Sequence, residues 1–129
     1  MNTHLLDSNI LILALRGRPL ALDLLDRFRS SDEASISVVT RTEVLAGMRP
    51  YEERITVELL LALLSLPVTE GIADRAGRLI YALARTGVQF SFPDALIAAT
   101  ALEHDLTLVT TNARHYPVAE LKVQEFDAN

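Results

Sequence analysis

The sequence contains no cysteine and no tryptophan, and Lys122 is its only lysine among 129 residues. The lack of cysteine excludes disulfides, zinc–thiolate sites and a cysteine nucleophile. The N-terminus has no basic region, and Asp7 and Asn9 interrupt its first apolar run, so a signal peptide is not expected. A reducing cytoplasm is the simplest location for such a chain.

Long hydrophobic runs and aromatic residues are also scarce. The most apolar stretch, Leu59 to Leu64, is far shorter than the roughly 20 residues of a bilayer span, so no membrane insertion is expected. Aromatic residues make up only 5% of the chain, which argues against a stacking platform for single-stranded nucleic acid. Phe92 and Tyr116 flank the candidate site described below, and both are expected to pack in the core.

Positive charge is limited as well. The formal net charge of −5 opposes passive binding to phosphates, which proteins normally attract with lysine and arginine. Any chemistry on nucleic acid would therefore need a bound divalent cation or a local group of arginines. Arg114 is a candidate for a phosphate contact, although it could equally be an ordinary exposed arginine.

The remaining composition is that of a packed protein. Half of the residues are apolar, with five glycines and five prolines. The length suits one core, because single cores commonly serve chains of about 100 to 150 residues. We therefore predict a single domain over residues 1–129.

Short apolar runs alternate with helical patterns along the chain. Leu5 and Leu6 predict a strand, Ser8 is a candidate N-cap for the next helix, and Thr40 to Glu43 has the form of a capping box. The predicted strands lie near residues 5–6, 36–39, 66–68, 106–109 and 121–126, and the predicted helices near 10–15, 19–29, 40–49, 52–65, 72–83 and 91–102. Strands separated by helices imply crossover connections. The predicted fold is a three-layer α/β/α sandwich with a mostly parallel sheet of four or five strands.

Four polar residues stand at predicted junctions between strands and helices: Asp7, Glu43, Asp94 and Asn112. In open parallel sheets, ligands bind beyond the carboxyl ends of the strands, so these side chains can converge there. Each residue alone has another explanation, because acids and amides are common helix caps and turn residues. Glu43 is three residues after Thr40 and Asp94 three after Ser91, the spacing of a capping box.

The joint pattern favours a metal site. Clustered carboxylates repel one another, and a hard cation such as Mg²⁺ or Mn²⁺ relieves that repulsion. Asp7, Glu43 and Asp94 would supply carboxylates, while Ser8, Thr110 and Asn112 would add neutral oxygens or hold water. Such a site suits phosphodiester hydrolysis. Among the histidines, His115 near Asn112 is the best placed general base, but none has ligand spacing.

Four segments, in the right order, resemble the motifs of PIN domains: Leu5–Ile12 the opening motif, Val39–Gly47 the glutamate-bearing helix, Pro93–Ala101 the third acidic motif, and Leu108–Asn112 the final Thr-x-Asp/Asn segment. The resemblance spans nearly the whole chain. The short, single-domain length of the chain is most similar to that of the VapC toxins. It implies a Mg²⁺- or Mn²⁺-dependent endoribonuclease that inhibits translation. It also implies a homodimer held inactive by a VapB-like antitoxin.

The resemblance places Asp7, Glu43 and Asp94 on the family's metal-coordinating acids, and Ser8 and Thr110 on hydroxyl positions beside them. Asn112 departs from the family, because many PIN domains have aspartate there. One metal ion, or a weakly held second, is therefore expected.

Other functions remain open from sequence alone. A non-catalytic PIN-like interaction module would use the acids for capping or docking. A phosphoacceptor receiver domain needs a late lysine near the acids, and Lys122 lies in the predicted terminal strand. DNA could replace RNA as substrate, because the contact that reads a 2′-hydroxyl has no sequence signature here.

Overall fold

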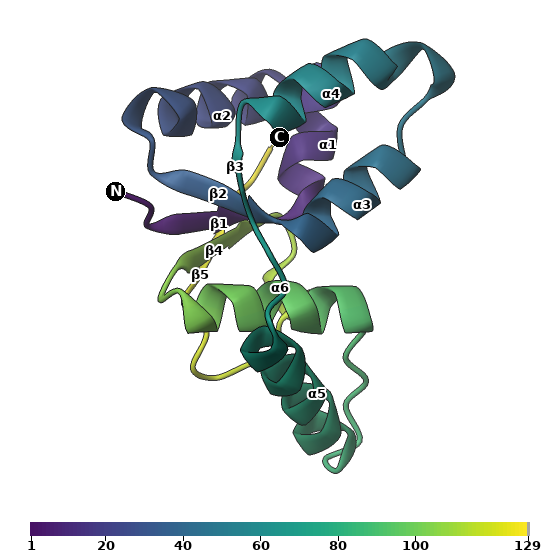
Figure 1. Ribbon diagram of the computed structural model, residues 1–129, viewed down its shortest axis with the longest axis vertical. Coiled ribbons are helices and arrows are strands. Elements are labelled where there is room, and N and C mark those ends of the chain that lie inside the picture. Colours follow the sequence, from purple (N-terminus) through teal and green to yellow (C-terminus); the bar gives the residue numbers. More distant parts are fainter. Residues whose placement is uncertain (129) are drawn as a thin grey trace.

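A parallel five-stranded sheet crosses the middle of the computed structural model, which describes residues 1–128 (Figure 1). The strand order is β3-β2-β1-β4-β5, and every pairing is parallel. The strands are β1 His4–Leu6, β2 Ala34–Ser37, β3 Leu64–Leu66, β4 Thr107–Thr110 and β5 Val123–Glu125. The predicted parallel sheet is confirmed, and the strand predicted over residues 121–126 is the shorter edge strand β5.

Helices cover both faces of this sheet. One face carries α1 Ser8–Leu15, α2 Pro19–Ser31, α3 Val38–Ala46 and α4 Glu53–Leu61, and the other carries α5 Glu70–Ala84 and α6 Phe92–Glu103 (Figure 1). The predicted three-layer arrangement is therefore confirmed. None of the helices within residues 1–128 is both long and apolar enough to cross a membrane.

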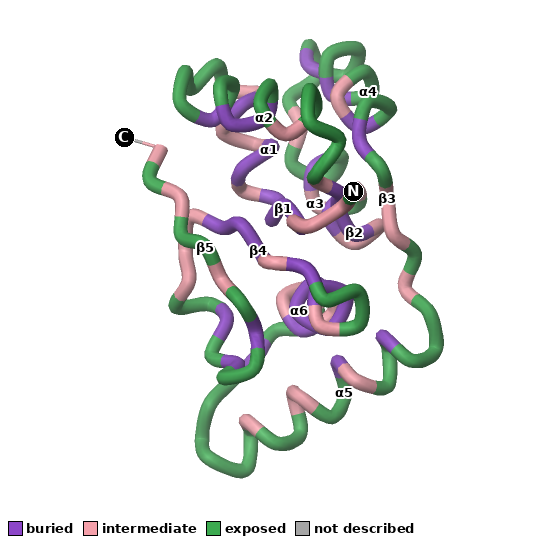
Figure 2. The backbone as a smooth tube through the Cα atoms, turned by 90° about the vertical axis from the view of Figure 1, so that its left-hand side faces the viewer, coloured by how far each residue is buried: buried purple, intermediate pink, exposed green. Residues whose placement is uncertain are grey.

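Successive side chains along each strand point to opposite faces of the sheet, so the protein has two hydrophobic cores, one on each face. Leu5 and Leu108 face the α5–α6 layer, whereas Leu6 and Val109 face the layer of α1, α2 and α4, and all four are fully buried. Burying one such side chain stabilises the fold by about 1.5–3 kcal/mol. In Figure 2, α6 lies in the interior with mostly buried positions, while α5 forms an outer layer with many exposed ones. The two cores hold the central strands, and hence their carboxyl ends, in fixed positions.

The predicted helix over residues 52–65 is wrong at its end. Helix α4 stops at Leu61, and residues 64–66 form β3, which pairs with β2. The predicted weak strand at 66–68 is therefore shifted toward the N-terminus. Pro67 follows β3 directly, and because proline has no N–H to donate, it is a natural end for this edge strand.

The predicted capping box from Thr40 to Glu43 is also wrong. Helix α3 begins earlier, at Val38, and its N-cap is Ser37, whose hydroxyl accepts a hydrogen bond from Val39 N at 3.0 Å. Thr40 is fully buried within the helix. Glu43 is therefore one turn inside α3 and is not needed to cap it, so its side chain is available for other contacts.

Candidate active site

Asp7 is the most enclosed acid of the site. It follows β1 directly and is only 6% exposed. Its Oδ1 accepts a hydrogen bond from Ser8 N at 2.8 Å, which makes Asp7, and not the predicted Ser8, the N-cap of α1. Its Oδ2 accepts from Thr110 Oγ1 at 2.8 Å, because the parallel pairing of β1 with β4 brings the two strand ends together. Both carboxylate oxygens are thus held in place.

Ser8 links Asp7 to the glutamate on α3. Its buried hydroxyl donates to Glu43 Oε1 at 2.5 Å, and the Thr40 hydroxyl lies 3.4 Å from Ser8 Oγ. Glu43 itself is half-buried. This hydrogen bond joins Ser8 to Glu43, which lie 35 positions apart in the sequence, and it directs the Glu43 carboxylate toward the start of α1.

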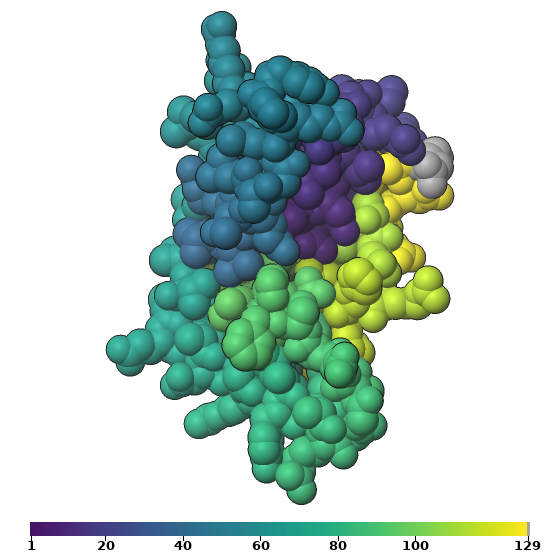
Figure 3. Space-filling model, turned by 90° about the vertical axis from the view of Figure 1, so that its right-hand side faces the viewer, coloured from purple at the N-terminus to yellow at the C-terminus, as the bar shows by residue number. Residues whose placement is uncertain are grey.

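Asp94 approaches from the opposite layer. It lies half-buried in the first turn of α6, where Ser91 Oγ caps the helix by accepting from Asp94 N at 3.3 Å. Its Oδ1 accepts a hydrogen bond from the Tyr116 hydroxyl at 3.3 Å. Figure 3 looks onto the edge where the start of α1, α3, α6 and the turn after β4 meet. The three predicted acids all belong to this edge, which we call the acidic crevice: Asp7, Ser8, Glu43, Asp94, Thr110 and Tyr116.

The electrostatics of the crevice show that its acids repel one another. Burial raises the pKa of Asp7, the charge of Asp94 raises it further, and the hydrogen bond from Thr110 partly opposes the shift. The pKa of Glu43 is raised by burial and by the charges of Asp7 and Asp94, against the hydrogen bond from Ser8. The charged state of this crevice is therefore destabilised unless positive charge enters it.

Tyr116 was expected only to pack in the core, and it does so, at 4% exposure and edge-on to Phe90. Its hydroxyl, however, lies among the acids, donating to Asp94 and interacting with Asp7. Burial and the charge of Asp7 raise its pKa far above the ordinary range, so the hydroxyl remains a donor. Phe92, in contrast, is 72% exposed, so its predicted burial is wrong. No motif in the sequence distinguishes these two rings.

The remaining predicted residues lie at the rim. Asn112 N donates to Thr110 Oγ1 at 3.1 Å, while the Asn112 side-chain amide lies 3.0 Å from His115 Nε2. Arg114 is exposed and belongs to the same short 3-10 turn as His115, residues 113–115. The structure therefore gathers the three acids with Ser8 and Thr110, but pairs Asn112 with His115 and leaves Arg114 on the surface.

The donor set suits a hard cation. All the side chains of the crevice offer oxygen atoms, the ligand type preferred by Mg²⁺ and Mn²⁺. No lysine or arginine within residues 1–128 forms a salt bridge with Asp7, Glu43 or Asp94. In the present side-chain conformations, no three acidic or histidine side chains of residues 1–128 are close enough to enclose an ion. Side-chain rotation of the two half-buried acids would be needed to close such a site.

A family model, a curated relative and a solved structure each match most of this chain. The family model for the PIN domain matches residues 4–121. Ribonuclease VapC10 of Mycobacterium tuberculosis is 41% identical over 116 residues, which cover 90% of this chain and 87% of that protein. A toxin–antitoxin complex from Klebsiella pneumoniae contains a chain with a TM-score of 0.77 and 29% identity, covering 97% of this chain and 99% of that one.

A DNA-bound VapBC from Salmonella typhimurium has a TM-score of 0.85 at 24% identity, covering 97% of this chain and 98% of that one, and it supports the fold. The family model and the VapC10 relative both span most of the sequence. This chain belongs to the PIN-domain family, within the VapC group.

Proposed function

We propose that this protein is an endoribonuclease that hydrolyses RNA phosphodiester bonds with Mg²⁺ or Mn²⁺ held by Asp7, Glu43 and Asp94. The observation that carries the proposal is the convergence of three mutually repelling carboxylates, without a basic partner, at the carboxyl ends of the strands. A binding scaffold gains nothing from such repulsion, whereas a metalloenzyme uses it to hold a cation. The ribonuclease names of the curated relatives support the substrate class.

The side chains of the crevice have distinct roles in this proposal. Asp7 is the fixed ligand, because Ser8 N and Thr110 hold both of its oxygens. Ser8 orients Glu43, and Tyr116 orients Asp94. When bound, the cation would lower the pKa of a water molecule and polarise the phosphoryl group. Asn112, a neutral amide, adds no charge, so one ion, or one ion with a weakly held second, is expected.

The biological role follows from the relatives. We propose a toxin that inhibits translation by cutting RNA, that is controlled by a VapB-like antitoxin and that acts as a homodimer in the cytoplasm. Solved structures of similar chains are VapBC and toxin–antitoxin complexes, which supports the antitoxin partner. Arg114, exposed near Asp94, is the proposed contact to a substrate phosphate.

The test is cleavage of a mixed structured RNA by purified, antitoxin-free protein with Mn²⁺, with EDTA, and with Asp94→Asn in parallel. Asp74→Asn, which changes an exposed acid on α5, is the matched control. Cleavage that needs both Mn²⁺ and Asp94, and that persists in the control, supports the nuclease. Absence of cleavage by folded protein on several RNAs would instead support a non-catalytic module, and cleavage of DNA alone would change the substrate.

A further inference from the structure

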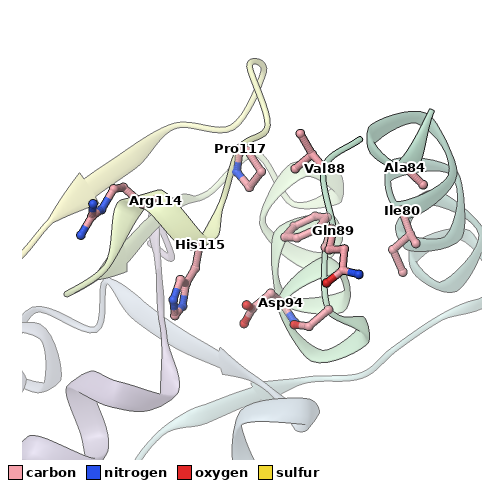
Figure 4. A pocket seen from close by; sticks show the side chains of 10 residues that line it. Ile80, Ala84, Val88, Gln89, Asp94, Arg114, His115 and Pro117 are labelled. Atoms are coloured by element: carbon pink, nitrogen blue, oxygen red, sulfur yellow. The ribbon is translucent and has the colours of Figure 1, made fainter. Parts of the chain in front are cut away.

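A cavity of about 610 Å³ opens directly beside Asp94. It lies between the C-terminal end of α5, the segment of residues 88–91 that precedes α6, and the turn of residues 114–117 (Figure 4). Ligand pockets commonly have volumes of about 300–1,000 Å³. The cavity is therefore large enough for a substrate group, and it shares a wall with the acidic crevice.

The walls of this cavity are mainly apolar. Ile80 and Ala84 of α5 face Val88 and Pro117 across it, and Gln89 contributes a side-chain amide (Figure 4). The Gln89 amide forms no hydrogen bond within residues 1–128 and is exposed to solvent. The amide thus offers a donor and an acceptor, side by side, to a flat polar edge held between aliphatic walls.

We propose that this cavity binds one unpaired nucleobase of the RNA, adjacent to the phosphate that is cut, and that Gln89 reads its edge. The inference rests on the proposed nuclease function and assigns its sequence preference to one subsite. RNA is commonly recognised through unpaired bases that are splayed out and hydrogen-bonded along their edges. An amide is a frequent partner of such an edge, as in its paired contacts with adenine.

Charge determines which part of the nucleotide enters. Asp94 lines the cavity, and the cation that it is proposed to hold would draw the phosphate that is cut into the acidic crevice, so the mainly apolar cavity beside it is left for a neutral base. Arg114 borders the cavity and extends outward from the turn, whereas the His115 ring points toward Asp94 (Figure 4). Arg114 has no ion pair within residues 1–128, so its guanidinium is available to a backbone phosphate. The base therefore fits inside and the sugar–phosphate chain fits along the rim.

Binding can be tested without cleavage, by titrating the four uncharged nucleosides into ¹⁵N-labelled protein and following backbone amide shifts. At least one nucleoside should shift Val88 and Gln89. Ala84→Phe, which fills the cavity from an exposed position of α5, should lower that affinity by about tenfold or more. Ala73→Phe on the same helix lies outside the cavity and should bind as the wild type does. Failure of all four nucleosides to bind, or unchanged binding by Ala84→Phe, would overturn the proposal.

The second measurement sequences the cleavage products of a random RNA library. We expect a base preference at one fixed distance from the cut, weakened about tenfold by Gln89→Ala with the position of the cut unchanged. If the protein cleaves RNA but has no base preference, or has one that Gln89→Ala does not change, the base pocket is refuted and the nuclease function is not. Nucleoside binding without RNA cleavage would support the pocket and refute the nuclease, so the two failures are distinguishable.

Discussion

The two sides of the acidic crevice are built very differently. On the side of β1, α1 and α3, Asp7 and Ser8 are buried, and hydrogen bonds connect them to Thr110 and Glu43. On the side of α6 and the turn after β4, Asp94 is half-buried, and the single side-chain hydrogen bond that reaches its carboxylate within residues 1–128 comes from Tyr116. We call these the fixed side and the open side.

This difference indicates a division of roles. A buried ligand held by two hydrogen bonds loses little freedom when a cation binds, so the fixed side is preorganised. The open side borders the cavity beside Asp94 and the exposed Arg114. We therefore expect the fixed side to contribute most to metal binding and catalysis. On the open side, we expect Asp94 and Tyr116 to contribute to metal binding as well, and the cavity residues and Arg114 to determine substrate choice.

Asp7→Asn should produce the largest effect. Removing a charge-stabilising group commonly lowers kcat by about 100- to 1,000-fold, and RNA cleavage should fall at least that far. The melting temperature of the metal-free protein should rise at neutral pH, because a buried and repelled charge is removed. Asp94→Asn should also abolish cleavage but should change the melting temperature little, because Asp94 is half-exposed. Equal melting temperatures for wild type and Asp7→Asn would contradict the repulsion.

Ser8→Ala should have the next largest effect. Without the hydroxyl, Glu43 loses the hydrogen bond that directs it, and loss of such a support typically weakens metal affinity by about 10- to 100-fold. Mn²⁺ titration calorimetry measures this. The matched control is Ser91→Ala on the open side, which removes the cap of α6 and should lower stability by about 1 kcal/mol while leaving Mn²⁺ affinity unchanged.

Tyr116→Phe should lower Mn²⁺ affinity by less than Ser8→Ala does. The ring should remain packed against Phe90, so the fold should persist, but Asp94 loses its donor. We expect Mn²⁺ affinity to fall by about tenfold. An affinity equal to that of the wild type would show that the hydroxyl does not position Asp94.

The pH dependence of stability should be the smallest of these effects. The folded pKa of Asp7 is raised above its ordinary value of 3.8, so the folded state binds its proton more tightly than the unfolded state does. The resulting stabilisation is complete below that value and is lost as pH rises through the folded pKa. In urea denaturation from pH 4 to 7, metal-free wild type should lose stability relative to Asp7→Asn as pH rises. A constant difference between them would contradict the raised pKa.

Much of this arrangement was accessible from the sequence. The sequence predicts that Asp7, Glu43 and Asp94 converge at one edge of a parallel sheet. In the structure Asp7 directly follows β1, Glu43 lies one turn inside α3 and Asp94 lies in the first turn of α6, and all three interact electrostatically. The start of α3 was missed because Ser37 and Thr40 are both suitable caps, and the buried environment of Thr40 has no local signature. The sequence around Tyr116 likewise predicts that the ring is buried, but it does not show which group the hydroxyl binds.

The wrong end of the predicted helix over residues 52–65, where the structure has β3, has a similar cause. The leucines of residues 59–66 fit a helical period as well as an edge strand, and only pairing with β2 decides between them. The cavity beside Asp94 was also inaccessible, because α5, the segment before α6 and the turn of residues 114–117 meet only in the folded chain. The order of strands and helices is thus predictable from sequence, whereas the exact ends of strands and the contacts between layers depend on pairing and packing in the folded chain.

The most direct test of the central claim is the position of Mn²⁺ in crystals of the protein, located by anomalous scattering. The account predicts an ion in the acidic crevice, bound by Asp7 with Glu43 or Asp94 turned toward it, and absent from crystals of Asp7→Asn. Manganese bound only at exposed acids such as Asp23 and Asp26 of α2, with the crevice unchanged, would contradict it.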